Sequence, residues 1–181
     1  MGNGYPAAAF GGREEVMSVL PDKVSHGGTY AGNRIAAAAA VKTLQIIRDT
    51  NALDVIHATG RRVQAGLREV LNPTGLPYHF TGHPSMFGIM FTDEVPTEYR
   101  DWAKSDHELY DAVALGMFAR GAMPEPDSRE PWFICEAHAQ GDTVDQVVSI
   151  FEDSLRAALE GRAHGDVPEA GHGAMSHPGA G

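Results

Sequence analysis

The segment His26-Gly27-Gly28-Thr29-Tyr30-Ala31-Gly32-Asn33 places a glycine-rich loop directly before an alanine run at residues 36–40. Asn33 is a good helix N-cap, and the alanines favour a helix that packs closely against another backbone. Backbone N–H groups point outward at the start of such a helix, and the helix dipole favours negative charge there. Gly28 and the Thr29 hydroxyl therefore predict an anion site. Taken alone, the segment matches neither a P-loop nor a dinucleotide fingerprint, and a turn with a helix cap explains it as well.

A second glycine-rich stretch opens the chain. Gly2-Asn3-Gly4-Tyr5-Pro6 is typical of a turn, and Phe10-Gly11-Gly12-Arg13 follows it. We expect a short strand at residues 7–10 and one or two helical turns at residues 14–20. Globular domains rarely begin inside such a loop, so we expect residues 1–50 to be the end of a larger domain.

Residues 51–162 are predicted to form a small α+β domain. The first helix shows apolar positions at helical spacing and ends at Asn72-Pro73-Thr74-Gly75, where proline and glycine disfavour its continuation. Two strands are expected at residues 78–81 and 86–91, and a third at residues 132–136. The apolar positions of the first helix are Leu53, Ile56, Val63, Leu67 and Val70.

Two further helices are predicted from capping-box patterns. Ser105-Asp106-His107-Glu108 has the S-x-x-E form and opens a helix that is expected to end at Gly121. Thr143-Val144-Asp145-Gln146 opens the last helix in the same way. Together with the strands, these helices predict an α+β layer with helices on one face of a short sheet.

The composition is that of a globular protein, with 43% hydrophobic and 21% charged residues. The net charge of −10 argues against nucleic acid or an anionic membrane as a partner, because no basic patch is available to neutralise phosphates. The longest apolar run, at residues 35–41, is too short to span a bilayer. The single cysteine, Cys135, excludes an internal disulfide and suits the cytoplasm, and its apolar neighbours predict a buried core residue.

Residues 163–181 consist mainly of Gly, Ala, His and Pro without an apolar period, so we predict a disordered tail. His164, His172 and His177 lie in this segment. Their spacing fits no standard metal site, and no metal is expected.

The ordered set of motifs resembles the class III aminotransferases and aminomutases, which depend on pyridoxal 5'-phosphate (PLP). The set consists of the two glycine-rich stretches, the alanine-rich helix and Glu136-Ala137-His138, and it covers residues 2–159. The similarity is greatest to the branch of glutamate-1-semialdehyde 2,1-aminomutase. It implies an α/β fold, the PLP-dependent transferase fold type I, of which this chain holds the end of the large domain and the small α+β C-terminal domain.

The resemblance also implies roles for a few residues. Thr29, with the backbone of Gly28, matches the family's phosphate-binding position, which acts in the neighbouring subunit's site across a homodimer. Glu130 aligns with a family glutamate near the active-site entrance, and the adjacent Arg129 is a candidate receptor for a substrate carboxylate. A surface salt bridge explains Arg129 and Glu130 equally well. This alignment crosses residues 124–129, where the chain departs from the family pattern.

No catalytic residue is assigned, because the family's Schiff-base lysine would fall just upstream of Met1. Lys23, Lys42 and Lys104 do not match that position. The implied activity is amino-group migration within one amino-acid substrate. Two alternatives stay open: transamination of an amino acid or β-amino acid with a keto-acid acceptor, and a non-catalytic fragment or pseudoenzyme. The chain by itself is expected to be inactive.

Overall fold

The computed structural model describes residues 1–20 and 24–164, in two units that comprise residues 1–53 and the chain from Asp54 onward. The predicted tail at residues 163–181 lies outside the described residues, except that the last helix continues through Ala163 to His164. Lys23, His172 and His177 also lie outside them.

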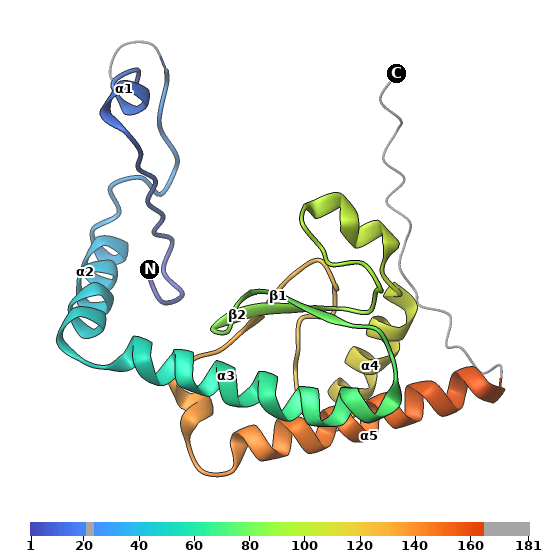
Figure 1. Cartoon of the computed structure of the whole chain (residues 1–181). Helices are drawn as coiled ribbons and strands as arrows, with labels where there is room; N and C mark the ends of the chain where they lie inside the picture. The colour runs from blue at the N-terminus through green and yellow to red at the C-terminus, as the bar shows by residue number, and fades with distance from the viewer. Residues whose placement is uncertain (21–23, 165–181) are drawn as a thin grey trace, which may run out of the picture. The chain divides into compact units, whose positions relative to one another are not determined.

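The first unit is built around helix α2 (Arg34–Asp49), which is preceded by the single turn α1 (Glu14–Met17) (Figure 1). The Asn33 side chain accepts a hydrogen bond from the Ala36 N–H at 2.9 Å, which confirms the predicted N-cap. The strand predicted at residues 7–10 is wrong, because this segment belongs to no sheet among the described residues. A strand requires a neighbour for its backbone hydrogen bonds, and residues 7–10 pair with none in this part of the chain.

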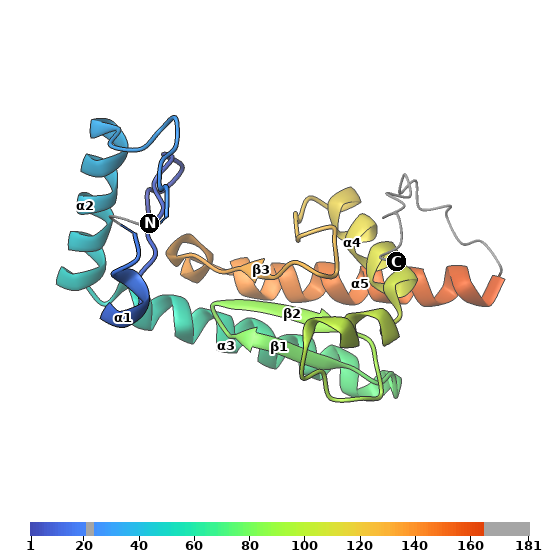
Figure 2. The ribbon, with the colours of Figure 1, turned by 90° about the horizontal axis from the view of Figure 1, so that it is seen from above.

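The second unit contains a three-stranded antiparallel sheet in the order β1-β2-β3. β1 (His79–His83) pairs with β2 (Met86–Met90), which pairs with β3 (Trp132–Phe133). Helices α3 (Ala52–Leu71), α4 (His107–Ala119) and α5 (Thr143–His164) contribute to the same core as this sheet. Figure 1 and Figure 2 show the β1–β2 hairpin running alongside α3.

Alternation along β2 gives the sheet two different faces. Phe87 and Ile89 are almost fully buried and belong to the core that the helices complete. Gly88 and Met90 have the opposite orientation, as period-two alternation requires. The core also takes apolar residues from each helix: Val63, Leu67 and Leu71 of α3, Leu109, Val113 and Met117 of α4, and Val144, Phe151 and Leu155 of α5.

Both predicted capping boxes are wrong. α4 begins at His107, and its N-cap is Asp106, whose carboxylate accepts from the Leu109 N–H at 3.0 Å. A carboxylate at this position interacts more favourably with the helix dipole than the Ser105 hydroxyl would. Thr143 is already the first residue of α5, and its hydroxyl donates to the Gln140 carbonyl instead of capping the helix.

The third strand is shorter than predicted, and Cys135 is exposed rather than buried. The strand stops after Phe133, and a 3-10 turn (Glu136–Ala139) follows with Cys135 as its N-cap. The Cys135 N–H donates to His138 Nδ1 at 2.9 Å, so the backbone turns away before the sheet can continue. The local apolar run therefore gave the wrong environment for this side chain.

α3 and α5 pack closely because Gly66 leaves room for Val148 (Figure 1). A Cβ atom at position 66 would lie 2.4 Å from Val148 Cγ2. Valine has a restricted χ1 angle, so it cannot easily turn away.

Gly66→Ala should therefore destabilise the second unit, although alanine is the better helix former by about 1 kcal/mol. Overpacking costs roughly 1–3 kcal/mol, so we expect a net loss in the free energy of unfolding. In the Val148→Ala background the same change should be neutral or stabilising. Urea denaturation of the four proteins measures this coupling, and a destabilisation that persists without the Val148 methyl groups contradicts it.

Among the residues that the structure describes, no helix combines the length and the apolar character needed to cross a bilayer.

Candidate functional site

The first candidate site is the loop before α2. The Gly28 carbonyl accepts from the Ala31 N–H at 2.9 Å, and the Tyr30 carbonyl accepts from the Asn33 N–H at 3.1 Å. These two turns follow one another, and Gly32 allows the second by adopting a φ of +74°. The sequence therefore folds into two consecutive turns that lead directly into the N-cap of α2.

This loop has the donors that an anion requires. Gly28, Thr29 and Tyr30 are exposed, and their N–H groups donate to no acceptor among the described residues. The Thr29 hydroxyl likewise has no partner in this part of the chain. Backbone N–H groups and a hydroxyl near a helix N-terminus suit a phosphate group. The residues present therefore fit the phosphate of a cofactor such as PLP.

The lysines that the structure describes are poorly suited to act as nucleophiles. Lys104 lies within 2.5 Å of the Glu94 carboxylate and 3.5 Å of Asp101. The hydrogen bond to Glu94 raises the pKa of Lys104 above its usual range. A nucleophilic lysine requires the opposite shift. Lys42 is exposed on α2.

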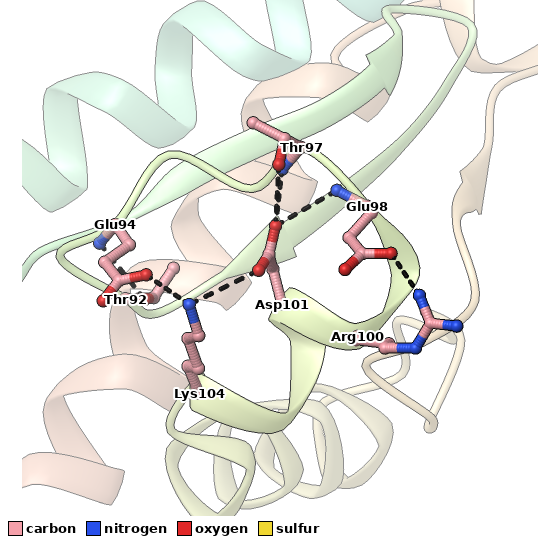
Figure 3. A network of polar contacts seen from close by, with 7 residues as sticks. All are labelled: Thr92, Glu94, Thr97, Glu98, Arg100, Asp101 and Lys104. Atoms are coloured by element: carbon pink, nitrogen blue, oxygen red, sulfur yellow. Dashed lines mark hydrogen bonds and ion pairs between the residues drawn. The ribbon is translucent and has the colours of Figure 1, made fainter.

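The segment that carries Lys104 is fixed by Asp101, as Figure 3 shows. The Asp101 carboxylate accepts hydrogen bonds from the N–H groups of Thr97 at 2.9 Å and Glu98 at 3.1 Å, and from the Thr97 hydroxyl at 3.0 Å. These hydrogen bonds, with that from the Thr97 N–H as the largest cause, lower the pKa of Asp101 to about 2. The carboxylate is therefore ionised at neutral pH and holds the start of the 3-10 turn Tyr99–Lys104 in place.

The second candidate site is a cleft of about 390 Å³ in the second unit. Its floor is the face of the β1–β2 hairpin opposite the core, and its walls are formed by segments 96–102 and 128–131. Arg129 and Glu130, the two residues predicted to control the substrate, both line it. The other lining residues are Thr81, Gly82, Met86, Gly88, Met90, Pro96, Thr97, Glu98, Tyr99, Trp102, Ser128 and Pro131.

Arg129 is tied to Asp127. Its Nε donates to both carboxylate oxygens of Asp127 at 2.9 and 3.0 Å, and Nη2 donates to the same group. The hydrogen bond that Arg129 donates to Asp127 is the largest cause that raises the pKa of Arg129, and a hydrogen bond with Tyr99 adds to it. The guanidinium also lies 5.1 Å from the centre of the Trp102 ring. The cationic charge of Arg129 is therefore largely neutralised within the protein.

Glu130 differs from its neighbour. It is exposed, and its carboxylate forms no ion pair with any residue that the structure describes. Only its backbone N–H is engaged, with the Asp127 carbonyl at 2.9 Å. The two adjacent candidates therefore have distinct environments, since the Arg129 charge is paired and the Glu130 carboxylate has no ion-pair partner among the described residues.

Residues remote in sequence hold this loop, and the sequence analysis missed them. Trp102 Nε1 donates to the Ser128 hydroxyl at 2.8 Å. Trp132 Nε1 donates to the Tyr110 hydroxyl at 2.8 Å, and that hydroxyl donates to the Glu125 carbonyl at 2.7 Å. Burial raises the pKa of Tyr110 to about 12, so the phenol keeps its proton. Pairs such as Trp102 and Ser128 leave no local signal, because they are 26 positions apart.

The fold is shared with solved transaminases. An omega-transaminase from Sphaerobacter thermophilus superposes with a TM-score of 0.66 at 27% identity, over 82% of this chain and 35% of that chain. The FumI protein of Sphingopyxis sp. MTA144, in a form that contains PLP, gives a TM-score of 0.63 at 27% identity, over 78% of this chain and 31% of that chain. The fold is thus part of the PLP-dependent transferase fold type I, as predicted.

The family model for aminotransferase class-III matches residues 1–154. Glutamate-1-semialdehyde 2,1-aminomutase from Neisseria meningitidis serogroup C / serotype 2a is 31% identical over 159 residues, 87% of this chain and 37% of that protein. The chain therefore belongs to the class-III aminotransferase family, which confirms the resemblance. It spans a little over a third of the length of the curated relatives that it matches.

A stacked pair of rings lies beside the cleft. His107 stacks on Trp102 with ring centres 3.8 Å apart, and its Nδ1 lies 3.0 Å from the Ser105 hydroxyl. Burial is the largest influence on the pKa of His107 and lowers it below its ordinary 6.5, although Asp111, Asp106 and Asp127 act in the opposite direction.

We expect an NMR titration to place the pKa of His107 below 6.5. The unfolded chain then binds the proton first as the pH falls, so the stability gained from the neutral ring is present above pH 6.5 and is lost as the pH falls through the folded pKa. His107→Phe keeps a stacked ring without a titrating group. Its unfolding free energy should depend less on pH in that range, and an unchanged pH dependence contradicts the assignment.

Proposed function

We propose that this chain is the C-terminal part of a PLP-dependent enzyme that moves an amino group on an amino-acid substrate, with an aminomutase related to glutamate-1-semialdehyde 2,1-aminomutase as the first choice. The observation that carries this proposal is the pair of consecutive turns at residues 28–33, whose free donors fit a phosphate. The 31% identity to curated aminomutases supports the choice of reaction.

When bound, PLP supplies an electron sink for chemistry at the substrate carbon. The part of the chain before α2 would hold its phosphate through the Thr29 hydroxyl and the backbone of Gly28. In the second unit, the cleft that Arg129 and Glu130 line would select the substrate. Deprotonation of the substrate requires a general base, and Lys104 is a poor one because its ion pair with Glu94 favours the protonated amine.

Transamination is the second candidate reaction. The 27% identity to the omega-transaminase from Sphaerobacter thermophilus supports it. The unusual run at residues 128–132, which contains Arg129 and Glu130, also supports this second reaction. Product analysis distinguishes the two reactions, since a mutase yields an isomer of its substrate without a keto-acid acceptor, whereas a transaminase requires one.

A homodimer in which Thr29 serves the neighbouring subunit's site is part of the same proposal. The first unit supports it by exposing large apolar side chains that a single copy leaves in water. α2 buries only Ala36. The exposed residues are Phe10, Val16, Tyr30, Ile35, Val41, Leu44 and Ile46. A cytoplasmic location completes the proposal, since the single cysteine suits a reducing compartment.

Thr29→Val should weaken the binding of PLP. The loss of a charge-assisted hydrogen bond to phosphate costs roughly 1.5–3 kcal/mol, or about 10- to 150-fold in affinity. The test uses a chimera in which this chain replaces the corresponding part of the Neisseria aminomutase, with PLP titrated by its absorbance. Ser25→Ala, in the same exposed loop, is the matched control. Equal PLP affinity in both variants would sink the phosphate assignment.

The 181-residue chain alone should turn over no amino donor. Incubation with PLP, borohydride reduction and mass spectrometry should give scattered, substoichiometric labelling of lysines, because exposed amines are mostly protonated at neutral pH. Lys104→Arg should leave the pattern at the other lysines unchanged. Stoichiometric labelling of a single lysine together with turnover would show that the chain contains its own catalytic amine.

A further inference from the structure

The charges around the cleft fall into two internal pairs and one open carboxylate. Glu98 pairs with Arg100 at 2.5 Å, and Arg129 pairs with Asp127. Each pair brings opposite charges together, so their effects on a ligand largely cancel. The Glu130 carboxylate has no such partner in the described part of the chain. Its charge therefore decides which ligand charge the cleft prefers.

Arg129 is a poor receptor for a carboxylate in this arrangement. A carboxylate is recognised best by two parallel N–H groups of a guanidinium. Asp127 occupies Nε and Nη2, which form one such edge, and Tyr99 takes a further hydrogen bond. An incoming carboxylate would also meet the charges of Asp127 and Glu130. Asp127 and Trp102 therefore hold the Arg129 side chain in place as part of the cleft wall.

The remaining surfaces of the cleft suit a short amine. Tyr99 lines the cleft and is 71% exposed as a residue, and an aromatic face attracts an ammonium group. Met86, Met90, Pro96 and Pro131 supply apolar contacts for a carbon chain. A volume of about 390 Å³ lies within the range of small-molecule sites.

We infer that this cleft binds a primary ammonium group on a short apolar chain, with Glu130 as its counter-ion, Tyr99 as its aromatic contact, and Arg129 held out of the role of receptor by Asp127. The inference deepens the proposed function, because it makes the substrate an amino compound whose far end carries an amine rather than a second carboxylate. It rests on the proposed function only for the identity of that substrate. The binding itself does not depend on PLP.

The test follows the indole N–H signals of the 15N-labelled chain during titration with n-butylammonium chloride and, separately, sodium n-butyrate at equal ionic strength. The chain has two tryptophans, and the signal lost in Trp102→Phe is the probe. We expect this signal to shift and saturate with n-butylammonium at a Kd on the order of millimolar. Sodium n-butyrate should leave it in place.

Glu130→Gln should weaken n-butylammonium binding by about tenfold, since it keeps the shape of the side chain and removes the charge. Glu136→Gln, which changes an exposed glutamate outside the cleft lining, is the matched control and should bind normally. A well-dispersed amide spectrum for each variant shows that it remains folded. Asp127→Asn should release Arg129 and allow a measurable response to n-butyrate.

Three outcomes overturn the inference: saturable binding of n-butyrate to the unaltered chain, n-butylammonium binding that survives Glu130→Gln, or no response to either probe. None of these readouts contains PLP. Failure of the Thr29 experiment would remove the phosphate assignment and leave the cleft result standing. Failure here would leave the phosphate loop intact.

Discussion

The packing of Phe87 and Ile89 against the helices determines the rest of the second unit. These two side chains are buried in one core with residues of α3, α4 and α5, so the face of β2 that carries them is covered. Period-two alternation then assigns Gly88 and Met90 to the opposite face. The core that the α-helices complete lies on the other side of the sheet. On this face, segments 96–102 and 128–131 enclose a cleft. Because Phe87 and Ile89 must be buried, the opposite face of β2 is left to form the candidate substrate surface.

The walls of the cleft depend on polar contacts between distant segments. Trp102 donates a hydrogen bond to the Ser128 hydroxyl. The Tyr110 hydroxyl accepts one from Trp132 and donates one to the Glu125 carbonyl. Such hydrogen bonds contribute modestly when formed and cost more when a buried donor loses its partner. Asp127 and Arg129 are therefore presented on a loop that is fixed at both sides, which is the condition for a selective site.

The first unit has a different character. Its structure is set by turns and by one helix, and it buries little of its own apolar surface. The candidate phosphate loop at residues 28–33 is shaped by hydrogen bonds between residues three positions apart, so its turns form locally. A partner surface would cover the exposed apolar side chains of α2, in keeping with the proposed dimer.

The sequence by itself determined the local features: the Asn33 cap, the stop of α3 at Asn72–Thr74, the apolar faces of the helices and the ordered motifs of the family. These depend on residues within a few positions of one another. The tertiary structure decided the exposure of Cys135, the hydrogen bond from Trp102 to Ser128 and the placement of the Arg129 guanidinium over the Trp102 ring. Spacing cannot show these, because a side chain's partner and its burial depend on which distant segments the folded core brings beside it.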